Sequence, residues 1–215
     1  MEWIILKRLQ TIAAEKLGKG SEYLQTARNI ELPMHDPRLA PGYARTYQYD
    51  PPPGRHVKGG LGMVQMSNPD PAKYNYENTG EADYSATVFS EVLDCAGLCL
   101  FITLTGQAEA IPKLLEAVTG IEPQEAMAAG ARVLNMRQAF NVREGLRPSD
   151  FNIPLRSVGK PPLEKGPTAN CTVDNEKLGD NFFAAVGWDR TTGKPYREVL
   201  ERLGGMDDVI ADLYN

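Results

Sequence analysis

The stretch 32–82 limits the fold most strongly, because prolines and glycines recur throughout it. Prolines lie at positions 33, 37, 41, 51, 52, 53, 69 and 71, and glycines follow at 54, 59, 60 and 62. Proline lacks a backbone donor and clashes inside a helix, so this stretch cannot hold a long helix. Interleaved Tyr43, Tyr47 and Tyr49 favour an ordered, packed loop, and a loop of this length inside a domain usually has a function.

Helical spacing of apolar residues marks both sides of the stretch. Before it, the spacing over 5–17 predicts a helix within about 5–28, broken from Gly18, and Ser21 can cap a second short helix. After Gly80, an apolar stripe leads into Asp94 and continues as an apolar run.

The clearest helical pattern comes later in the chain. A predicted helix with one apolar face ends at Gly120, and Pro123 fits the first turn of the helix that follows it. That helix carries the best amphipathic stripe of the chain, a pattern that usually faces the core. The stripe consists of Ala126, Ala129, Val133, Met136 and Phe140.

In the final third of the chain, the sequence predicts a proline-rich loop over 147–172 and short helices over about 175–186, 196–203 and 206–213. No segment alternates convincingly with period two, so the fold class is mainly α, an irregular multi-helix domain with long Pro/Gly-rich connections. We expect a single domain over 1–215, composed of a helical lead-in (1–30), a loop-rich segment (31–80) and a helical core (81–215).

Composition excludes several classes of protein. With 42% hydrophobic and 24% charged residues the chain is ordinary for a globular protein, and its net charge of −5 offers no basic face for nucleic acid. Apolar runs stay well below the roughly 18 residues of a membrane span, and the first residues do not form a signal peptide, so a cytoplasmic location is expected. Three cysteines, Cys95, Cys99 and Cys171, argue against a disulfide framework.

The segment 94–99 (DCAGLC) is the first candidate site. It can be a helix junction in which Gly97 permits a turn and two thiols pack in the core. However, Asp94 follows an apolar run, and a buried carboxylate costs several kcal/mol unless a partner satisfies it. A ligand with N–H donors could be that partner.

The segment 54–60 (GRHVKGG) is the second candidate. Its spacing does not match a phosphate-loop signature, and it can be a solvated basic turn. His56 is nevertheless a candidate acid or base, because histidine titrates near neutral pH. The third segment, 34–38 (MHDPR), contains the other histidine, His35, and we interpret it as a structural turn in which Asp36 and Arg38 pair.

These segments occur together, in the same order, in one known family. The chain resembles the C-terminal helical region of tungsten-containing aldehyde:ferredoxin oxidoreductases. Segment 94–99 resembles the family's D-x-x-G-L-C motif, and His56 after Tyr43-Ala44 resembles its Y-A-x-S-x-R-G-x-x-H region. The other similar segments are 33–38 (PMHDPR), 140–145 (FNVREG), and 187–189 (GWD) with 192–195 (TGKP).

The resemblance implies a role for each matching residue. Asp94, the Leu98 backbone and Lys58 would contact a pterin, and Cys99 would be a thiolate ligand of a [4Fe–4S] cluster. His56 would be the proton donor or acceptor beside a tungsten bis-pterin (tungstopterin) centre that converts an aldehyde to a carboxylate. Ferredoxin would accept the electrons, and relatives in the family often pair as homodimers.

The chain also departs from the family pattern. A C-x-x-C-x-x-x-C run, the N-terminal pterin-binding domain, a first D-x-x-G-L motif and the catalytic glutamate have no counterpart here. Asp50-Pro51-Pro52-Pro53 replaces a serine-proline-arginine turn before His56. We therefore expect a fragment that needs the missing N-terminal part of the enzyme and cannot hold the full cofactor set alone.

Two alternatives stay open. A related member of the family could act on carboxylates or on aromatic acyl-CoA thioesters, as benzoyl-CoA reductases do. The chain could instead be a non-catalytic helical interaction module. The sequence does not distinguish tungsten from molybdenum, and it leaves the role of Cys171 open.

Overall fold

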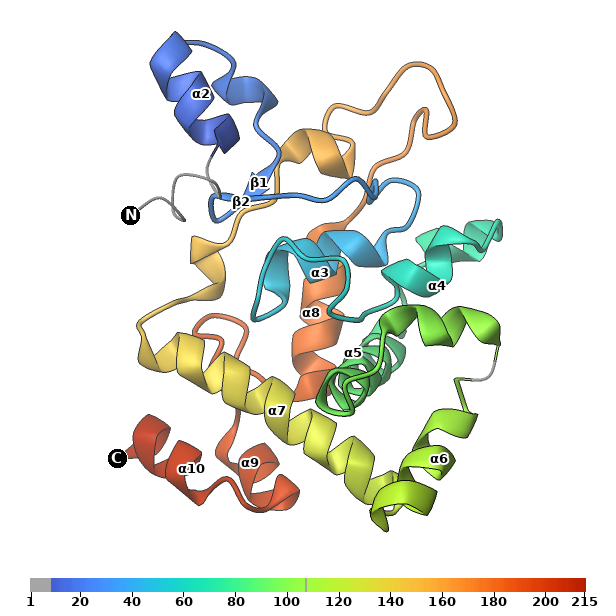
Figure 1. Cartoon of the computed structure of the whole chain (residues 1–215). Helices are drawn as coiled ribbons and strands as arrows, with labels where there is room; N and C mark the ends of the chain where they lie inside the picture. The colour runs from blue at the N-terminus through green and yellow to red at the C-terminus, as the bar shows by residue number, and fades with distance from the viewer. Residues whose placement is uncertain (1–8, 107) are drawn as a thin grey trace.

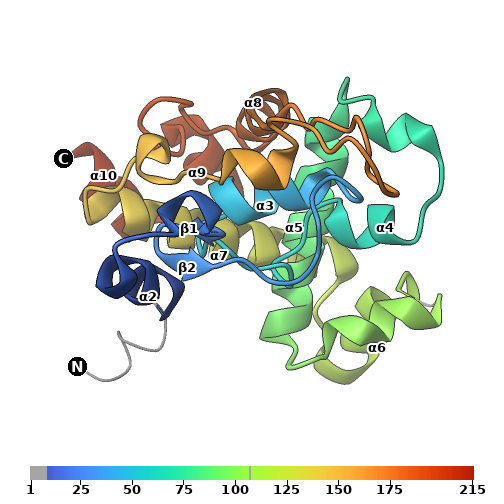
Figure 2. The ribbon, with the colours of Figure 1, turned by 90° about the horizontal axis from the view of Figure 1, so that it is seen from above.

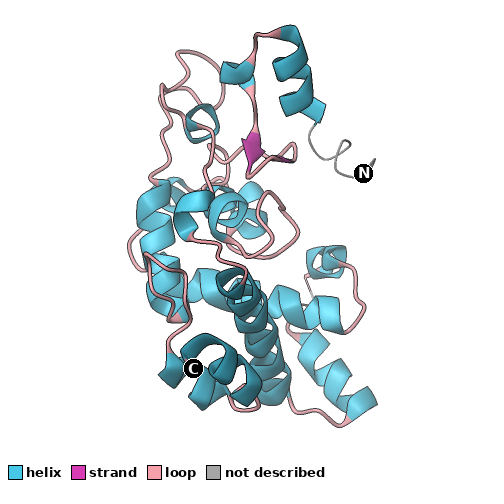
Figure 3. Ribbon diagram, turned by 90° about the vertical axis from the view of Figure 1, so that its left-hand side faces the viewer, coloured by secondary structure: helices cyan, strands magenta, loops and turns pink. Residues whose placement is uncertain are grey.

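The computed structural model of the chain describes residues 9–106 and 108–215 and shows a mainly helical protein, as predicted. Figure 3 shows that helices form nearly all of its regular structure and that the strands lie close to the N-terminal helix. Along these two ranges, no helix combines the length and the apolar character that a membrane crossing requires.

The N-terminal part holds a short helix and a small hairpin. Helix α2 (Leu9–Leu17) ends before Gly18 as predicted, while the part of that prediction before residue 9 lies outside the described residues. Gly20, rather than Ser21, precedes the short 3-10 helix η1 (Ser21–Tyr23). Strands β1 (Thr26–Ala27) and β2 (Ile30–Glu31) then pair antiparallel, which the sequence analysis did not predict.

The loop-rich stretch holds no long helix, as expected, but it contains short helices that the sequence did not predict. These are α3 (Gly42–Tyr49), α4 (Gly62–Met66) and the 3-10 turn η2 (Pro71–Tyr74). Every residue of α3 is buried, including the three tyrosines. Pro41 and Pro51 flank this helix, so the prolines limit its length rather than prevent it.

Three helices form the centre of the molecule around α3: α5 (Thr79–Cys95), α7 (Pro123–Arg143) and α8 (Asn175–Val186) (Figure 1). Helix α5 lies against both α7 and α8. At Gly130 of α7 a side chain would begin 2.6 Å from the Val88 carbonyl oxygen of α5, so glycine permits this close approach. The main core cluster comprises Tyr49, Val88, Ala131, Leu134, Phe182, Phe183, Val186 and Trp188.

The remaining helices surround this centre. Helix α6 (Ala110–Thr119) follows the 3-10 helix η3 (Leu100–Thr105) and stands at the edge of the molecule (Figure 2). Two 3-10 turns, η4 (Pro148–Asp150) and η5 (Leu155–Val158), interrupt the second proline-rich loop. Helices α9 (Arg197–Leu203) and α10 (Asp207–Tyr214) contact α7.

The amphipathic stripe of α7 faces the core only over its N-terminal part. The helix begins at Pro123 as predicted, but Met136 and Phe140 are 51% and 55% exposed. The buried face instead includes Leu134 and Asn135, and the Trp188 indole N–H donates to the Asn135 side-chain oxygen at 2.8 Å. The stripe is therefore buried at Ala126, partly buried at Ala129 and Val133, and exposed at its C-terminal end.

A buried charge network connects α3 to α5. The Arg45 guanidinium donates to both Asp83 carboxylate oxygens, at 2.7 and 2.5 Å, and to Asp50 Oδ1 at 3.1 Å. The Arg45 Cζ atom lies 4.0 Å from the centre of the Phe182 ring of α8. Burial raises the pKa of Asp50 to about 7, although Arg45 favours its charged form, and Asp50 Oδ2 has no hydrogen-bond partner.

Candidate active site

The loop that carries His56 and Lys58 lies directly against α5. Gly54 donates its N–H to the Tyr47 carbonyl oxygen at 2.8 Å, which ties the start of the loop to α3. Gly59 has φ of 96°, and a side chain there would begin 2.6 Å from the Thr87 Cα. Glycine is therefore required for the loop to turn and to contact the helix backbone.

His56 meets the other histidine of the chain. The ring centroids of His56 and His35 are 4.6 Å apart with an interplanar angle of 64°, so the two rings meet edge to face. Burial, and then the charge of His35, lower the pKa of His56 below its ordinary value. Both effects favour the neutral form of His56, which can accept a proton.

Lys58 and Asp94 form an ion pair between the loop and the last turn of α5. Asp94 is exposed rather than buried, so it does not carry the desolvation cost expected for a carboxylate inside an apolar run. An exposed ion pair stabilises a fold by only about 0–1 kcal/mol. The ion pair contributes little to stability, but it brings together Lys58 and Asp94, two of the predicted cofactor-binding residues.

The segment after Asp94 turns away from α5 and exposes both thiols. The Leu98 N–H donates to the Leu93 carbonyl oxygen at 2.9 Å, which closes the C-terminal turn of the helix. Cys95 and Cys99 are exposed, so the interpretation of two thiols packed in the core is wrong. Leu98 is partly buried, and Cys99 begins the link to η3 with its sulfur accessible.

A buried carboxylate near this segment was missed by the sequence analysis. Glu91 of α5 is 1% exposed, and its Oε1 lies 3.1 Å from Arg137 Nη1 of α7. Its Oε2 has no hydrogen-bond partner, and burial raises the pKa of Glu91. The available signal was a glutamate one residue before Val92, within the apolar stripe of α5.

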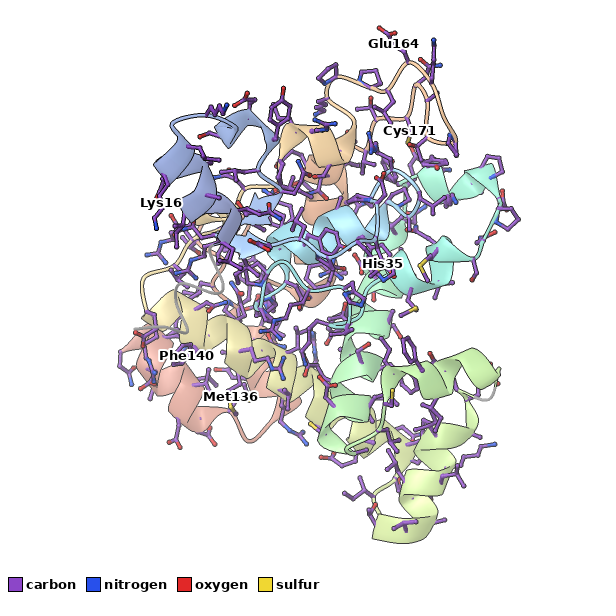
Figure 4. The ribbon with its side chains drawn as sticks, turned by 45° about the horizontal axis from the view of Figure 1, so that its top comes forward. Lys16, His35, Met136, Phe140, Glu164 and Cys171 are labelled. Atoms are coloured by element: carbon purple, nitrogen blue, oxygen red, sulfur yellow. The ribbon has the colours of Figure 1, made fainter. Side chains whose placement is uncertain are left out.

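An apolar groove lies beside Arg137. Its volume is ≈ 510 Å³. Met136 and Phe140, which Figure 4 labels on α7, contribute to its wall. The lining residues are Pro51, Pro52, Val133, Met136, Arg137, Phe140 and Asn141.

The segment 34–38 forms the turn that the sequence predicted. The Asp36 carboxylate accepts the Arg38 backbone N–H at 2.8 Å and pairs with its guanidinium at 2.7 Å. The Cys171 sulfur donates to the Arg38 carbonyl oxygen at 3.3 Å, which places this partly buried thiol against the turn. The interpretation as a structural turn is incomplete, because the turn also places His35 against His56.

The cysteines fit a shared metal site rather than a complete one. No group of three or more histidine, cysteine, aspartate or glutamate side chains is arranged to hold a metal ion within the described ranges. A [4Fe–4S] cluster takes four thiolate ligands. The accessible sulfur of Cys99 fits the role of one ligand, and the exposed Asp94 carboxylate fits an acceptor for ring N–H groups, so further ligands would have to come from elsewhere.

Comparison with known proteins identifies the family of the chain. A family model described as "Aldehyde ferredoxin oxidoreductase, domains 2 & 3" matches residues 10–204. The chain belongs to the aldehyde ferredoxin oxidoreductase family, and the resemblance drawn from its motifs is confirmed.

Curated relatives show what part of such a protein the chain corresponds to. It is 29% identical to the tungsten-containing aldehyde ferredoxin oxidoreductase of Pyrococcus furiosus, over 93% of this chain and 34% of the relative. The same enzyme of Thermococcus kodakarensis is 28% identical, over 88% of this chain and 34% of the relative. The chain thus spans about one third of the length of the curated relatives it matches.

Proposed function

We propose that the chain forms the C-terminal helical part of a tungsten-pterin, iron–sulfur oxidoreductase that oxidises aldehydes to carboxylates with ferredoxin as the electron acceptor. The observation that supports this most is the contact between the loop 55–60 and the C-terminal end of α5, called the seam below. There Lys58 pairs with Asp94, His56 lies two residues before Lys58, and Cys99 exposes its sulfur five residues after Asp94. The proposal includes a cytoplasmic location.

In this proposal the residues of the seam have separate tasks. Asp94 accepts hydrogen bonds from the N–H groups of a pterin, Lys58 balances that carboxylate and contacts the same ring system, and the Leu98 backbone lies against it. Cys99 supplies one thiolate to a [4Fe–4S] cluster. When bound, the tungsten centre would take two electrons from the aldehyde and water, and the cluster would pass them on singly to ferredoxin.

His56 is the proton acceptor of the proposal. A general base must be unprotonated at the working pH and lie within reach of the proton it removes. The lowered pKa of His56 meets the first condition at pH 7. Partial burial of its ring also limits competition from water at that position.

The rest of the enzyme would cover the apolar groove beside Arg137 of α7. Monomeric proteins rarely expose large contiguous apolar patches, yet Met136 and Phe140 are more than half exposed on one helix face. The curated relatives extend over about three times the length of this chain, so in proteins of that size further chain is available to pack there. We propose that the part lacking here binds this groove and supplies the remaining cluster ligands.

The proposal is tested by purifying the tagged chain anaerobically from the organism that encodes it, grown with tungstate. We expect it to co-purify with a polypeptide that carries the C-x-x-C-x-x-x-C run, with tungsten and iron bound and with aldehyde-dependent reduction of ferredoxin. The chain expressed alone should bind neither metal stoichiometrically. A native assembly free of tungsten and iron would refute the proposal and favour a non-catalytic interaction module.

A further inference from the structure

His35 is held at one end of a column of aromatic rings. It stacks on Tyr43 with ring centroids 5.3 Å apart and an interplanar angle of 14°, and Tyr43 stacks on Tyr47 at 5.6 Å and 10°. The Tyr47 hydroxyl donates to the His35 carbonyl oxygen at 3.0 Å, and both tyrosines are fully buried. Helix α3 therefore holds His35 twice, its ring through Tyr43 and its backbone through Tyr47.

His56 contacts the end of this column from a different segment of the chain. Its ring lies edge to face with His35 at 4.6 Å between centroids. His35, labelled in Figure 4 near the centre of the view, follows the hairpin, whereas His56 lies in the loop after α3. An edge-to-face contact with a fixed ring restricts how the second ring can turn.

We propose that His35 is the positioning residue of His56: it fixes the orientation of the His56 ring and disfavours a positive charge on that ring. The inference rests on the proposed role of His56 as a proton acceptor. His35 itself is not assigned any contact with substrate or cofactor.

The charges around the pair support this role. Two imidazolium rings in contact repel each other strongly, because part of their surface is removed from water. Two carboxylates from neighbouring segments have other partners, since Asp36, next to His35 in sequence, pairs with Arg38 and Asp94 of α5 pairs with Lys58. The other charged neighbour in the loop is the cation Arg55, and Tyr43 on α3 is neutral at pH 7, since burial raises its pKa.

An NMR titration of the chain alone tests the proposal. The chain has two histidines, so their ring signals can be assigned from the His35→Phe and His56→Ala variants. His35→Phe keeps a ring against Tyr43 and removes the titratable group. We expect the midpoint of His56 to move upward in this variant and its ring signals to keep the dispersion of an ordered ring.

Two controls make the outcome unambiguous. Met34→Ala changes the preceding side chain, which is 93% exposed, and should leave the His56 midpoint unchanged. The wild-type curve of His56 should also depart from that of a single independent site, because the charge on one ring affects the other. An unchanged midpoint in His35→Phe, or two independent curves in the wild type if the variant does not fold, would overturn the proposal.

This experiment separates the inference from the proposed function. The titration needs no cofactor and no activity, so it can succeed even if the enzyme proposal fails. In a complete enzyme, His35→Phe should move the acidic limb of the kcat/KM profile to higher pH and leave the metal content unchanged, since more His56 is then protonated at a given pH. A purely structural role of His35 would lower activity equally at all pH values.

Discussion

Replacing Arg45 by methionine tests the buried network most directly. Arg45 is fully buried and donates to Asp83 and Asp50, which are almost fully buried as well. Methionine retains much of the apolar stem but leaves both carboxylates without their cation. Removing one partner of a buried ion pair typically destabilises a protein by about 3–5 kcal/mol, because an uncompensated charge stays in the interior.

The value expected for Arg45→Met lies toward the upper part of that range at pH 8. At this pH most Asp50 is charged, since its pKa is about 7, so two carboxylates rather than one lose their partner. The variant also loses the contact of the guanidinium with the Phe182 ring, which is worth about 0.5–2 kcal/mol. The free energy of unfolding, measured by urea titration with circular dichroism, should therefore fall by about 4–5 kcal/mol.

Arg143→Met is the matched control. Arg143 pairs with Glu144 and Asp212, but all three side chains are about half exposed. Exposed pairs contribute about 0–1 kcal/mol, so this variant should lie close to the wild type. If Arg45→Met costs no more than Arg143→Met, the assignment of a stabilising cation to the buried network is wrong.

The remaining predictions concern pH, catalysis and assembly. The raised pKa of Asp50 means that this carboxyl binds a proton more tightly in the folded than in the unfolded state. The contribution of Asp50 to stability is therefore lost as pH rises from about 4 to about 7. Asp50→Asn should remove this contribution, so the urea midpoint of the variant should fall less than that of the wild type over the same pH window. In the complete enzyme, His56→Ala should abolish turnover while metal analysis shows retained tungsten and iron; unchanged turnover would remove His56 from the mechanism. The double variant Met136→Ser, Phe140→Ser should weaken binding to the rest of the enzyme about tenfold or more, measured by co-purification, and leave its urea midpoint nearly unchanged. Val118 is 84% exposed on α6, so Val118→Ser should leave assembly intact.

Local signals in the sequence predicted the helices well. Gly120 and Pro123 mark the junction between α6 and α7, and the apolar stripe before Asp94 marks α5. Helix α3 was missed because prolines on both sides suggested a continuous loop. The helix forms because its buried tyrosines and Arg45 gain contacts with distant segments, and a local pattern does not reveal such contacts.

The sequence proposed individual site residues but did not predict how they are arranged. Motif similarity selected His56, Lys58, Asp94 and Cys99, and the fold brings Lys58 against Asp94. The contact between the two histidines and the pairing of Glu91 with Arg137 depend on packing between segments far apart in sequence. The exposure of Met136 and Phe140 was not predicted for a related reason, because an exposed apolar residue and a core residue give the same periodic pattern in sequence.

The central claim, that this chain supplies one thiolate to a cluster shared with the rest of the enzyme, is tested by comparing Cys99→Ser with Cys95→Ser. Both thiols are exposed and lie four residues apart, so the two substitutions should perturb the fold equally little. Electron paramagnetic resonance of the reduced native assembly should lose the cluster signal in Cys99→Ser and keep it in Cys95→Ser. A full cluster signal in Cys99→Ser would contradict the account.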